Sequence, residues 1–228
     1  MPKRAGALLT VKLGRAELTG PWAIVALVCI VTLLVALLVW ARASLRMLVS
    51  GALWVGFTVY WGAAARNVAP TERAESAASR RVHTRLLNAS FLLLFLPIPG
   101  LRGRLLPLNL AVTVIGLSVQ LLFLLFAVSA RRHLGRNWSG AITVAQDHEL
   151  IRSGPYRLVR HPIYTAVLGM FLGTGIVSGE LHALLAILLI AGAYRRKIRL
   201  EERTLREVFG PVYQEYCRTT KAVIPFLL

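Results

Sequence analysis

The stretch GPYRLVRHPIYTAV, residues 154–167, decides the fold, because a group of polar side chains leads directly into an apolar segment. Its first half carries Arg157, Arg160 and His161, and its second half leads from Pro162 into an apolar run. Proline suits the first turn of a helix, where its missing N–H costs nothing, and it holds the preceding residue in extended backbone. The pattern therefore predicts a helix that begins at Pro162 with His161 at its cap.

The composition of the whole chain indicates that this helix lies in a membrane. Of the 228 residues, 56% are hydrophobic and only 16% are charged, which is far from the balance of a soluble globular protein. Apolar runs occupy residues 22–41, 47–65, 108–130 and 163–194. A span needs about 20 apolar residues, so each of the first three suffices alone. The fourth run is long enough for two short helices that turn at residues 178–180.

A weaker apolar segment, residues 86–99, contains Asn88 and ends in two prolines, so its length alone would allow a re-entrant segment. The charges favour a further span instead. If it crosses, 23 of the 27 lysine and arginine residues lie on one side, and only Arg42, Arg46, Arg102 and Arg104 lie on the other. The positive-inside rule then places both termini in the cytoplasm.

We therefore expect an all-α, polytopic transmembrane helix bundle of about six spans. Its last two spans form a helical hairpin, and a cytoplasmic C-terminal region binds a cofactor. The expected division is residues 1–130 for the N-terminal transmembrane helices and residues 131–228 for the catalytic region. The abundance of Arg and Ala and the compactness of the chain suggest a bacterial inner (plasma) membrane. The sequence does not indicate an oligomeric state.

The net charge of +17 would also suit a protein that binds nucleic acid. The basic residues, however, lie in short loops beside the expected spans, where topology and anionic lipid headgroups account for them. We therefore expect membrane lipid rather than nucleic acid as a partner. The two cysteines, Cys29 and Cys217, show no metal-ligand spacing, so we expect no metal.

Two segments outside the apolar runs carry further expectations. Residues 66–85 are rich in Ala, Ser, Arg and Glu and are expected to form a mobile linker or a surface helix. The stretch YRRKIRLEERTLREVFGPVYQEY, residues 194–216, keeps helical spacing. The last span is therefore expected to continue into the cytosol until Gly210-Pro211 ends it.

Two polar groups would meet at the cytoplasmic boundary. The N-terminus of the helix at Pro162 offers unpaired N–H groups and a positive dipole end, which suit a carboxylate or phosphate. On the last helix, Lys197 and Glu201 share a face, and a carboxylate there suits hydroxyls or an ammonium group. S-adenosylmethionine carries a carboxylate, hydroxyls and an ammonium group, so one such molecule would suit both positions. Each feature also has an ordinary explanation, since Lys197 and Glu201 would equally form a surface pair worth about 0.3–0.5 kcal/mol.

The stretch HELIRSGPYRLVRHPIYTAV, residues 148–167, and the stretch EERTLREVFGPVYQEYCRTTKAVIPF, residues 201–226, flank the expected hairpin. Together they resemble the C-terminal half of the isoprenylcysteine carboxyl methyltransferase family, which includes integral-membrane phospholipid methyltransferases. The resemblance covers roughly residues 131–226. It implies an S-adenosylmethionine-dependent methyltransferase that acts on a lipidic or prenylated acceptor. Carboxyl O-methylation and lipid amine N-methylation both stay open.

The resemblance also implies roles for individual residues. Those that match the family's cofactor-binding positions are His148, Glu149, Leu150, Ile151, Tyr156, His161, Pro162, Ile163, Tyr164 and Glu201. The family's substrate-side arginine falls on Lys197, which lacks the planar fork of a guanidinium. Lys197 and Glu202 are the candidate catalytic residues. Glu202 or Tyr164 would be needed as a general base only for an amine acceptor.

Two other classes of protein stay open at this point. One is an NADPH-dependent membrane reductase of the steroid-reductase type, whose C-terminal region has a related layout. The other is an inactive membrane module that retains the fold. The intact His161-Pro162 and Glu201-Glu202 pairs argue against the inactive module.

Overall fold

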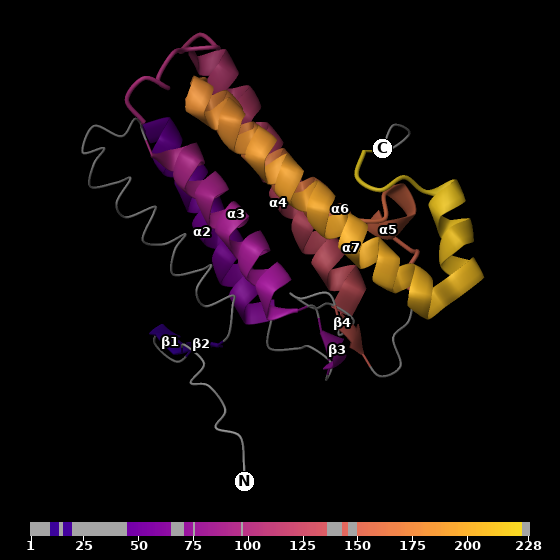
Figure 1. Cartoon of the computed structure of the whole chain (residues 1–228). Coiled ribbons are helices and arrows are strands. Elements are labelled where there is room, and N and C mark those ends of the chain that lie inside the picture. Colours follow the sequence, from indigo (N-terminus) through magenta and orange to yellow (C-terminus); the bar gives the residue numbers. More distant parts are fainter. Residues whose placement is uncertain are drawn as a thin grey trace.

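The computed structural model describes residues 10–13, 16–19, 45–64, 71–74, 76–96, 98–135, 143–145 and 150–224. The elements, in chain order, are β1 (Thr10–Leu13), β2 (Ala16–Thr19), α2 (Leu45–Ala64), β3 (Thr71–Ala74), α3 (Ala77–Phe95), α4 (Leu110–Leu134), β4 (Thr143–Ala145), α5 (Pro155–Leu158), α6 (Pro162–Ser178) and α7 (Leu181–Thr219). Long helices dominate the molecule (Figure 1). The first expected span, residues 22–41, lies outside the described residues.

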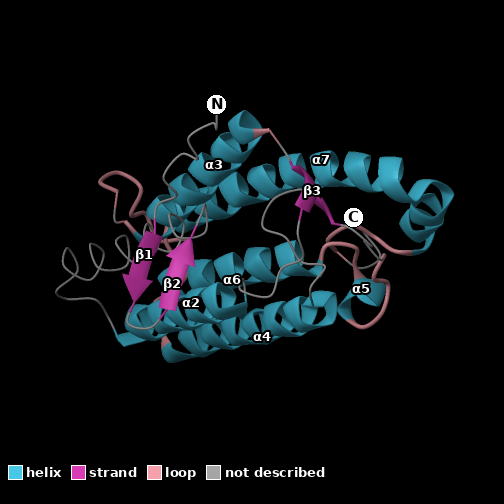
Figure 2. Cartoon of the chain, turned by 90° about the horizontal axis from the view of Figure 1, so that it is seen from below, coloured by secondary structure: helices cyan, strands magenta, loops and turns pink. Residues whose placement is uncertain are grey.

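The helices form two layers. The helices α2, α4 and α6 lie in one layer, and α3 pairs with α7 in the other (Figure 2). This arrangement confirms the predicted helical bundle. Two short antiparallel strand pairs, β1 with β2 and β3 with β4, were not predicted. Segments of three or four residues are too short for a period-two pattern to identify them.

Within the described residues, two helices are long and apolar enough to cross a membrane, α2 and α4. The helix α6 is apolar but shorter. The total of about six spans therefore stays a prediction, as does the placement of both termini in the cytoplasm.

The hairpin between α6 and α7 forms as predicted. Pro162 is the first residue of α6 and His161 is its N-cap. Gly179 ends the helix in the left-handed region, at φ +66°, which glycine adopts without a steric penalty. The segment before α4 holds this turn in place. The N–H groups of Leu105 and Leu106 donate to the carbonyl of Gly179 at 2.7 and 3.2 Å.

One of the two alternatives for residues 66–85 is confirmed for the last part of the stretch, and one expected boundary is wrong. The helix α3 begins at Ala77, where the Ser79 N–H donates to the Ser76 hydroxyl, so residues 77–85 form the start of a helix rather than a mobile linker. Gly210, at φ +51°, changes the direction of α7. The backbone resumes helical geometry after it, and the helix ends only at Thr219. Pro211 allows this because a proline is tolerated in the first turn of a new helical segment.

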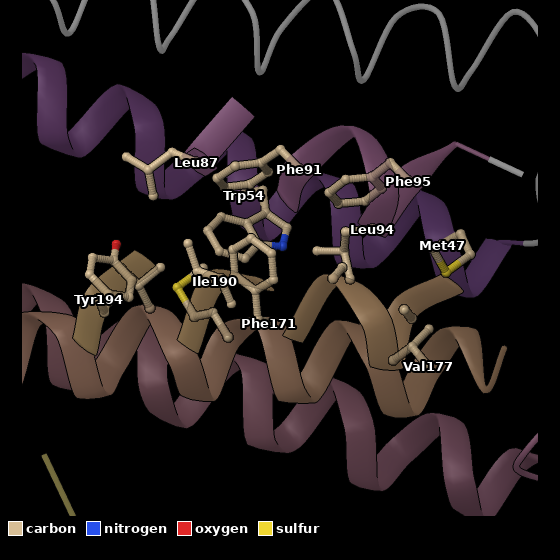
Figure 3. Close-up of a cluster of buried hydrophobic side chains, with 14 of the residues drawn as sticks. Met47, Trp54, Leu87, Phe91, Leu94, Phe95, Phe171, Val177, Ile190 and Tyr194 are labelled. Carbon is tan, nitrogen blue, oxygen red and sulfur yellow. The ribbon is translucent and has the colours of Figure 1, made fainter. Parts of the chain in front are cut away.

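The core joins α2, α3, α6 and α7. The ring of Trp54 meets the rings of Phe91 and Phe171 edge-on, at centroid distances of 4.8 and 5.3 Å (Figure 3). The Trp54 indole N–H donates to the hydroxyl of Thr174 at 2.9 Å. The hydroxyl of Ser50 donates to the side-chain amide oxygen of Gln120, Oε1, at 2.7 Å, so these buried polar groups from three helices satisfy one another.

The contact between α4 and α6 depends on glycine. A Cβ at Gly173 would lie 2.6 Å from the backbone nitrogen of Gln120 and 2.7 Å from the carbonyl oxygen of Gly116. We expect Gly173→Ala to force the two helices apart and to cost about 1–3 kcal/mol, measured as a lower thermal midpoint in lipid nanodiscs. Gly192→Ala is the matched control, because a Cβ there meets nothing within 4 Å. Equal midpoints for the two variants would contradict this packing.

Candidate active site

The candidate site lies where three parts of the chain meet: the corner between α5 and α6, the part of α7 beyond the hairpin, and residues 220–224 (Figure 1). The N–H groups of Arg160 and His161 donate to the carbonyls of Lys221 and Ala222 at 2.8 and 2.9 Å. The hydroxyl of Thr165 donates to the Val223 carbonyl at 2.7 Å. The C-terminal segment thus fixes the backbone at the start of α6.

Glu202 is the centre of a buried ionic cluster. Arg160 donates to its Oε1 from Nε at 3.0 Å and from Nη2 at 2.5 Å. Nε2 of His161 lies 3.3 Å from the same oxygen, and Nη2 of Arg206 lies 3.1 Å from Oε2. Burial alone would raise the pKa of Glu202, but the hydrogen bonds from His161 and Arg160 outweigh it and lower the pKa to about 2. The carboxylate is therefore ionised at neutral pH and held in one position.

Glu201 has a different environment. Its Oε2 accepts a hydrogen bond from the Tyr164 hydroxyl at 2.7 Å and lies 3.8 Å from Nδ1 of His161. Its side chain is 30% exposed, against 10% for Glu202. Among the described residues, Oε1 of Glu201 has no hydrogen-bond partner. The two adjacent glutamates therefore differ in kind, because Glu202 is fully engaged within the protein and Glu201 can accept a ligand.

A row of aromatic rings crosses from α6 through α7 to α3. The ring of Tyr164 stacks on His161 at 5.5 Å and on Tyr194 at 4.7 Å. Tyr194 in turn lies 5.8 Å from the ring of His83, and Figure 3 shows it at the end of the hydrophobic core. Nζ of Lys197 lies 5.9 Å from the centre of the Tyr164 ring. The row places Lys197 beside the same tyrosine that bonds Glu201.

The structure brings together most, but not all, of the residues that the sequence singled out. Tyr156, His161, Pro162, Tyr164, Lys197, Glu201 and Glu202 converge at this corner. Ile163 packs instead in the hydrophobic cluster around Trp61, and Leu150 and Ile151 are half-buried before α5. His148 and Glu149 lie outside the described residues.

Tyr156 is fixed from two directions. Its side chain is 7% exposed, and its carbonyl accepts a hydrogen bond from the Tyr216 hydroxyl. Burial, together with the charge of Glu201, raises the pKa of Tyr156, so the phenol stays protonated and can act only as a neutral group. Tyr216 belongs to the helical segment after Gly210, so the bend in α7 helps to build the site.

The sequence interpretation missed two groups of residues. Arg160 and Tyr216 were visible only as parts of the quoted stretches, and nothing local revealed what they bind. His83 lies in the stretch expected to be a mobile linker or a surface helix, and its position beside Tyr194 depends on how α3 packs on α7. In the part of the chain that the structure describes, no three His, Cys, Asp or Glu side chains are grouped as for a metal ion.

The fold defines the class of protein, a helical bundle in which two of the described helices are long and apolar enough to cross a membrane. The chain aligns with the solved structure of a eukaryotic intramembrane Ras methyltransferase, isoprenylcysteine carboxyl methyltransferase, at a TM-score of 0.56 and 20% identity. The alignment covers 90% of this chain and 75% of that one. At this identity the likeness establishes the fold.

Sequence comparison identifies the family that the C-terminal region resembles. Residues 111–212 match the phospholipid methyltransferase family. The cobalt-zinc-cadmium resistance protein CzcN of Cupriavidus metallidurans is 40% identical over 97 residues, 41% of this chain and 44% of that protein. A probable protein-S-isoprenylcysteine O-methyltransferase of Oryza sativa is 32% identical over 96 residues, 41% of this chain and 50% of that protein. The resemblance drawn from the motifs is thereby confirmed, and the match spans about half the length of these relatives.

Proposed function

We propose that the protein is an S-adenosylmethionine-dependent membrane methyltransferase that acts on a lipidic acceptor. The observation that carries the proposal is the difference between the hydrogen-bond environments of the two glutamates. Glu202 is locked by Arg160 and His161, while Oε1 of Glu201, beside the start of α6, has no hydrogen-bond partner among the residues that the structure describes. The family likeness of residues 111–212 supports the same activity.

The residues at this corner fit the cofactor chemically. A partly exposed carboxylate at Glu201 suits ribose hydroxyls or an ammonium group. The first N–H groups of α6 suit a carboxylate, and the side chain of the cap residue, His161, does not bond to them. Tyr156, His161, Pro162 and Tyr164 would line the remaining sides, with His148, Glu149, Leu150 and Ile151 before them in the chain. When bound, the cofactor supplies a methyl group on a positively charged sulfur.

The protein's own residues would then act by binding and orientation. A carboxylate acceptor is already ionised at neutral pH, so alignment and the exclusion of water suffice for the transfer. With a pKa of about 2, Glu202 is poorly suited to remove a proton. We propose that Glu202 positions Arg160 and His161 and that Lys197 faces the acceptor.

The proposal includes the arrangement of the chain in its membrane. Residues 1–130 would anchor the protein, and residues 131–228 would carry catalysis at the cytoplasmic face of a bacterial inner membrane. The cofactor would enter from the cytosol, and the acceptor would enter sideways from the bilayer. The reductase alternative has no support among the relatives, whose names describe methyltransferases or metal-resistance proteins.

The test is ligand binding to the purified protein in detergent. We expect S-adenosylmethionine and S-adenosylhomocysteine to raise the thermal midpoint and to give a measurable Kd by calorimetry, and we expect NADPH to do neither. Stabilisation by NADPH alone would contradict the proposal and favour the reductase.

A further inference from the structure

A second charged cluster lies at the far end of the helical bundle from the candidate active site. It gathers Arg46 from the first turn of α2, Arg102 and Arg104 from the segment before α4, and Glu180 from the turn between α6 and α7. Figure 1 shows the start of α2, the chain before α4 and the start of α7 at the same end of the bundle. The 17 residues of α6 separate this end from the candidate site, which corresponds to about 25 Å of helix.

Backbone hydrogen bonds fix the position of this cluster. The N–H groups of Leu181 and His182 donate to the carbonyls of Gly103 and Leu101 at 2.9 and 3.1 Å. They add to the two hydrogen bonds that the carbonyl of Gly179 accepts from the same segment. The segment before α4 and the turn of the hairpin therefore hold each other in place, and the arginine side chains start from fixed positions.

The carboxylate of the cluster does not balance the positive charges around it. Oε2 of Glu180 lies 3.7 Å from Nε of Arg102, and Oε1 lies 3.8 Å from Nη1 of Arg104. Both distances are longer than a hydrogen bond, whereas Nε2 of His182 lies 3.2 Å from Oε2. Arg46 also interacts electrostatically with Arg104 and Glu180. Three guanidinium groups thus share one carboxylate, so positive charge is in excess among these side chains.

Arg46 also has a buried donor without an acceptor. Its Nε has no hydrogen-bond partner in the part of the chain that the structure describes. Buried polar atoms are nearly always hydrogen-bonded, and neighbouring like charges repel one another. Both facts favour a ligand with negatively charged oxygens. A phosphate group is suitable, because a guanidinium can donate two parallel N–H bonds to its oxygens.

The surroundings of the cluster favour a lipid over a free phosphate. The helices α2 and α4 are the two described helices that are long and apolar enough to cross a membrane, and the cluster lies at the start of both. Leu45, Leu105, Leu108 and Leu110 lie near the arginines along the chain and are all more than half exposed. In a membrane such side chains contact acyl chains, while arginines reach the head-group layer.

We propose that Arg46, Arg102 and Arg104 bind the phosphate of an anionic lipid in the leaflet opposite the candidate active site. This lipid is not the methyl acceptor, because the length of α6 separates the two places. It neutralises the arginines and joins the hairpin turn to the starts of α2 and α4. The inference does not depend on the proposed methyl transfer. It also accounts for three of the four arginines that depart from the positive-inside distribution.

The first arm of the test measures the thermal midpoint of the delipidated full-length protein in an uncharged detergent. We expect phosphatidylglycerol to raise the midpoint by about 5–10 °C at 100 times its Kd. Phosphatidylcholine with the same acyl chains is expected to leave it unchanged, because the arginines repel its choline group. Glycerol phosphate, which has no acyl chains, is also expected to have no effect. An equal shift with glycerol phosphate, or no shift with phosphatidylglycerol, would overturn the inference.

The second arm locates the bound lipid with two double variants. Arg46→Gln with Arg102→Gln is expected to lose most of the shift caused by phosphatidylglycerol. Arg81→Gln with Arg132→Gln, at exposed arginines near the start of α3 and the end of α4, removes the same charge and is expected to keep the shift. Equal shifts in both variants would mean that the lipid binds elsewhere on the basic surface.

A single variant covers the case in which the first double variant does not fold. The side chain of Arg102 is 60% exposed and contacts Glu180 only at 3.7 Å, so Arg102→Gln is expected to fold normally. We expect it to weaken the binding of phosphatidylglycerol about fivefold in the same titration. An unchanged Kd would contradict the role of Arg102 in the cluster.

Binding of S-adenosylmethionine distinguishes this cluster from the candidate active site. Arg46→Gln with Arg102→Gln is expected to keep the wild-type Kd for S-adenosylmethionine, measured by calorimetry, because the cluster lies one length of α6 away from the start of that helix. A variant that lost the lipid and the cofactor together would overturn the separation of the two sites.

Discussion

Glu201→Gln is expected to weaken the binding of S-adenosylmethionine about 10- to 150-fold. Oε1 of Glu201 is free in the described structure, while Oε2 is held by Tyr164 at 2.7 Å, so a cofactor hydroxyl or ammonium would bond directly to the carboxylate. Hydrogen bonds to a charged group contribute about 1.5–3 kcal/mol, which gives this range of Kd. Calorimetry on the detergent-purified variant measures it, and His161→Ala is expected to lose binding in the same way.

The control for this prediction is Glu215→Gln. Glu215 lies on the same helix, is 59% exposed and, among the described residues, forms an ion pair only with Arg218, at 3.4 Å. Its replacement is expected to leave the Kd unchanged, because exposed pairs contribute little. If Glu201→Gln and Glu215→Gln bind S-adenosylmethionine equally well, the cofactor does not contact Glu201 and the assignment is wrong.

Local sequence signals predicted the parts of the fold that local geometry determines. Pro162 was identified as the first residue of α6, and Gly179 lies in the turn predicted for the hairpin. Both depend on backbone preferences of one or two residues. The end of α7 was predicted less well, because the same Gly210-Pro211 pair that breaks a helix can also begin the next one.

Contacts between distant residues could not be predicted in this way. The sequence put Glu201 and Glu202 side by side, but only the fold distinguishes them, since the partner that locks Glu202 is Arg160, 42 residues earlier. The same holds for His83 of α3, which meets Tyr194 only because α3 packs against α7 in the folded protein. The residue types of a site are visible in a motif, whereas their protonation and availability depend on tertiary contacts.

Glu202→Ala is expected to be the most destabilising single change in the site. Glu202 and Arg160 are both 10% exposed, and Nη2 of Arg160 lies 2.5 Å from the carboxylate. Removing one partner of a buried ion pair leaves the other charge buried without compensation, which costs about 3–5 kcal/mol. In a chain of this size that corresponds to a thermal midpoint lower by about 6–20 °C, measurable in detergent without any ligand.

Two further variants separate the buried pair from its exposed neighbour. Arg206→Ala removes a partner of the same carboxylate, but the Arg206 side chain is 49% exposed, so the expected loss of stability is below about 1 kcal/mol.

The double variant Arg160→Met with Glu202→Leu is expected to recover much of the stability lost in Glu202→Ala, because well-packed apolar side chains replace a buried pair at little cost. It should still fail to bind S-adenosylmethionine if the pair orients His161 for the cofactor. A double variant that is stable and binds normally would show that the Arg160–Glu202 pair holds the fold together without shaping the site.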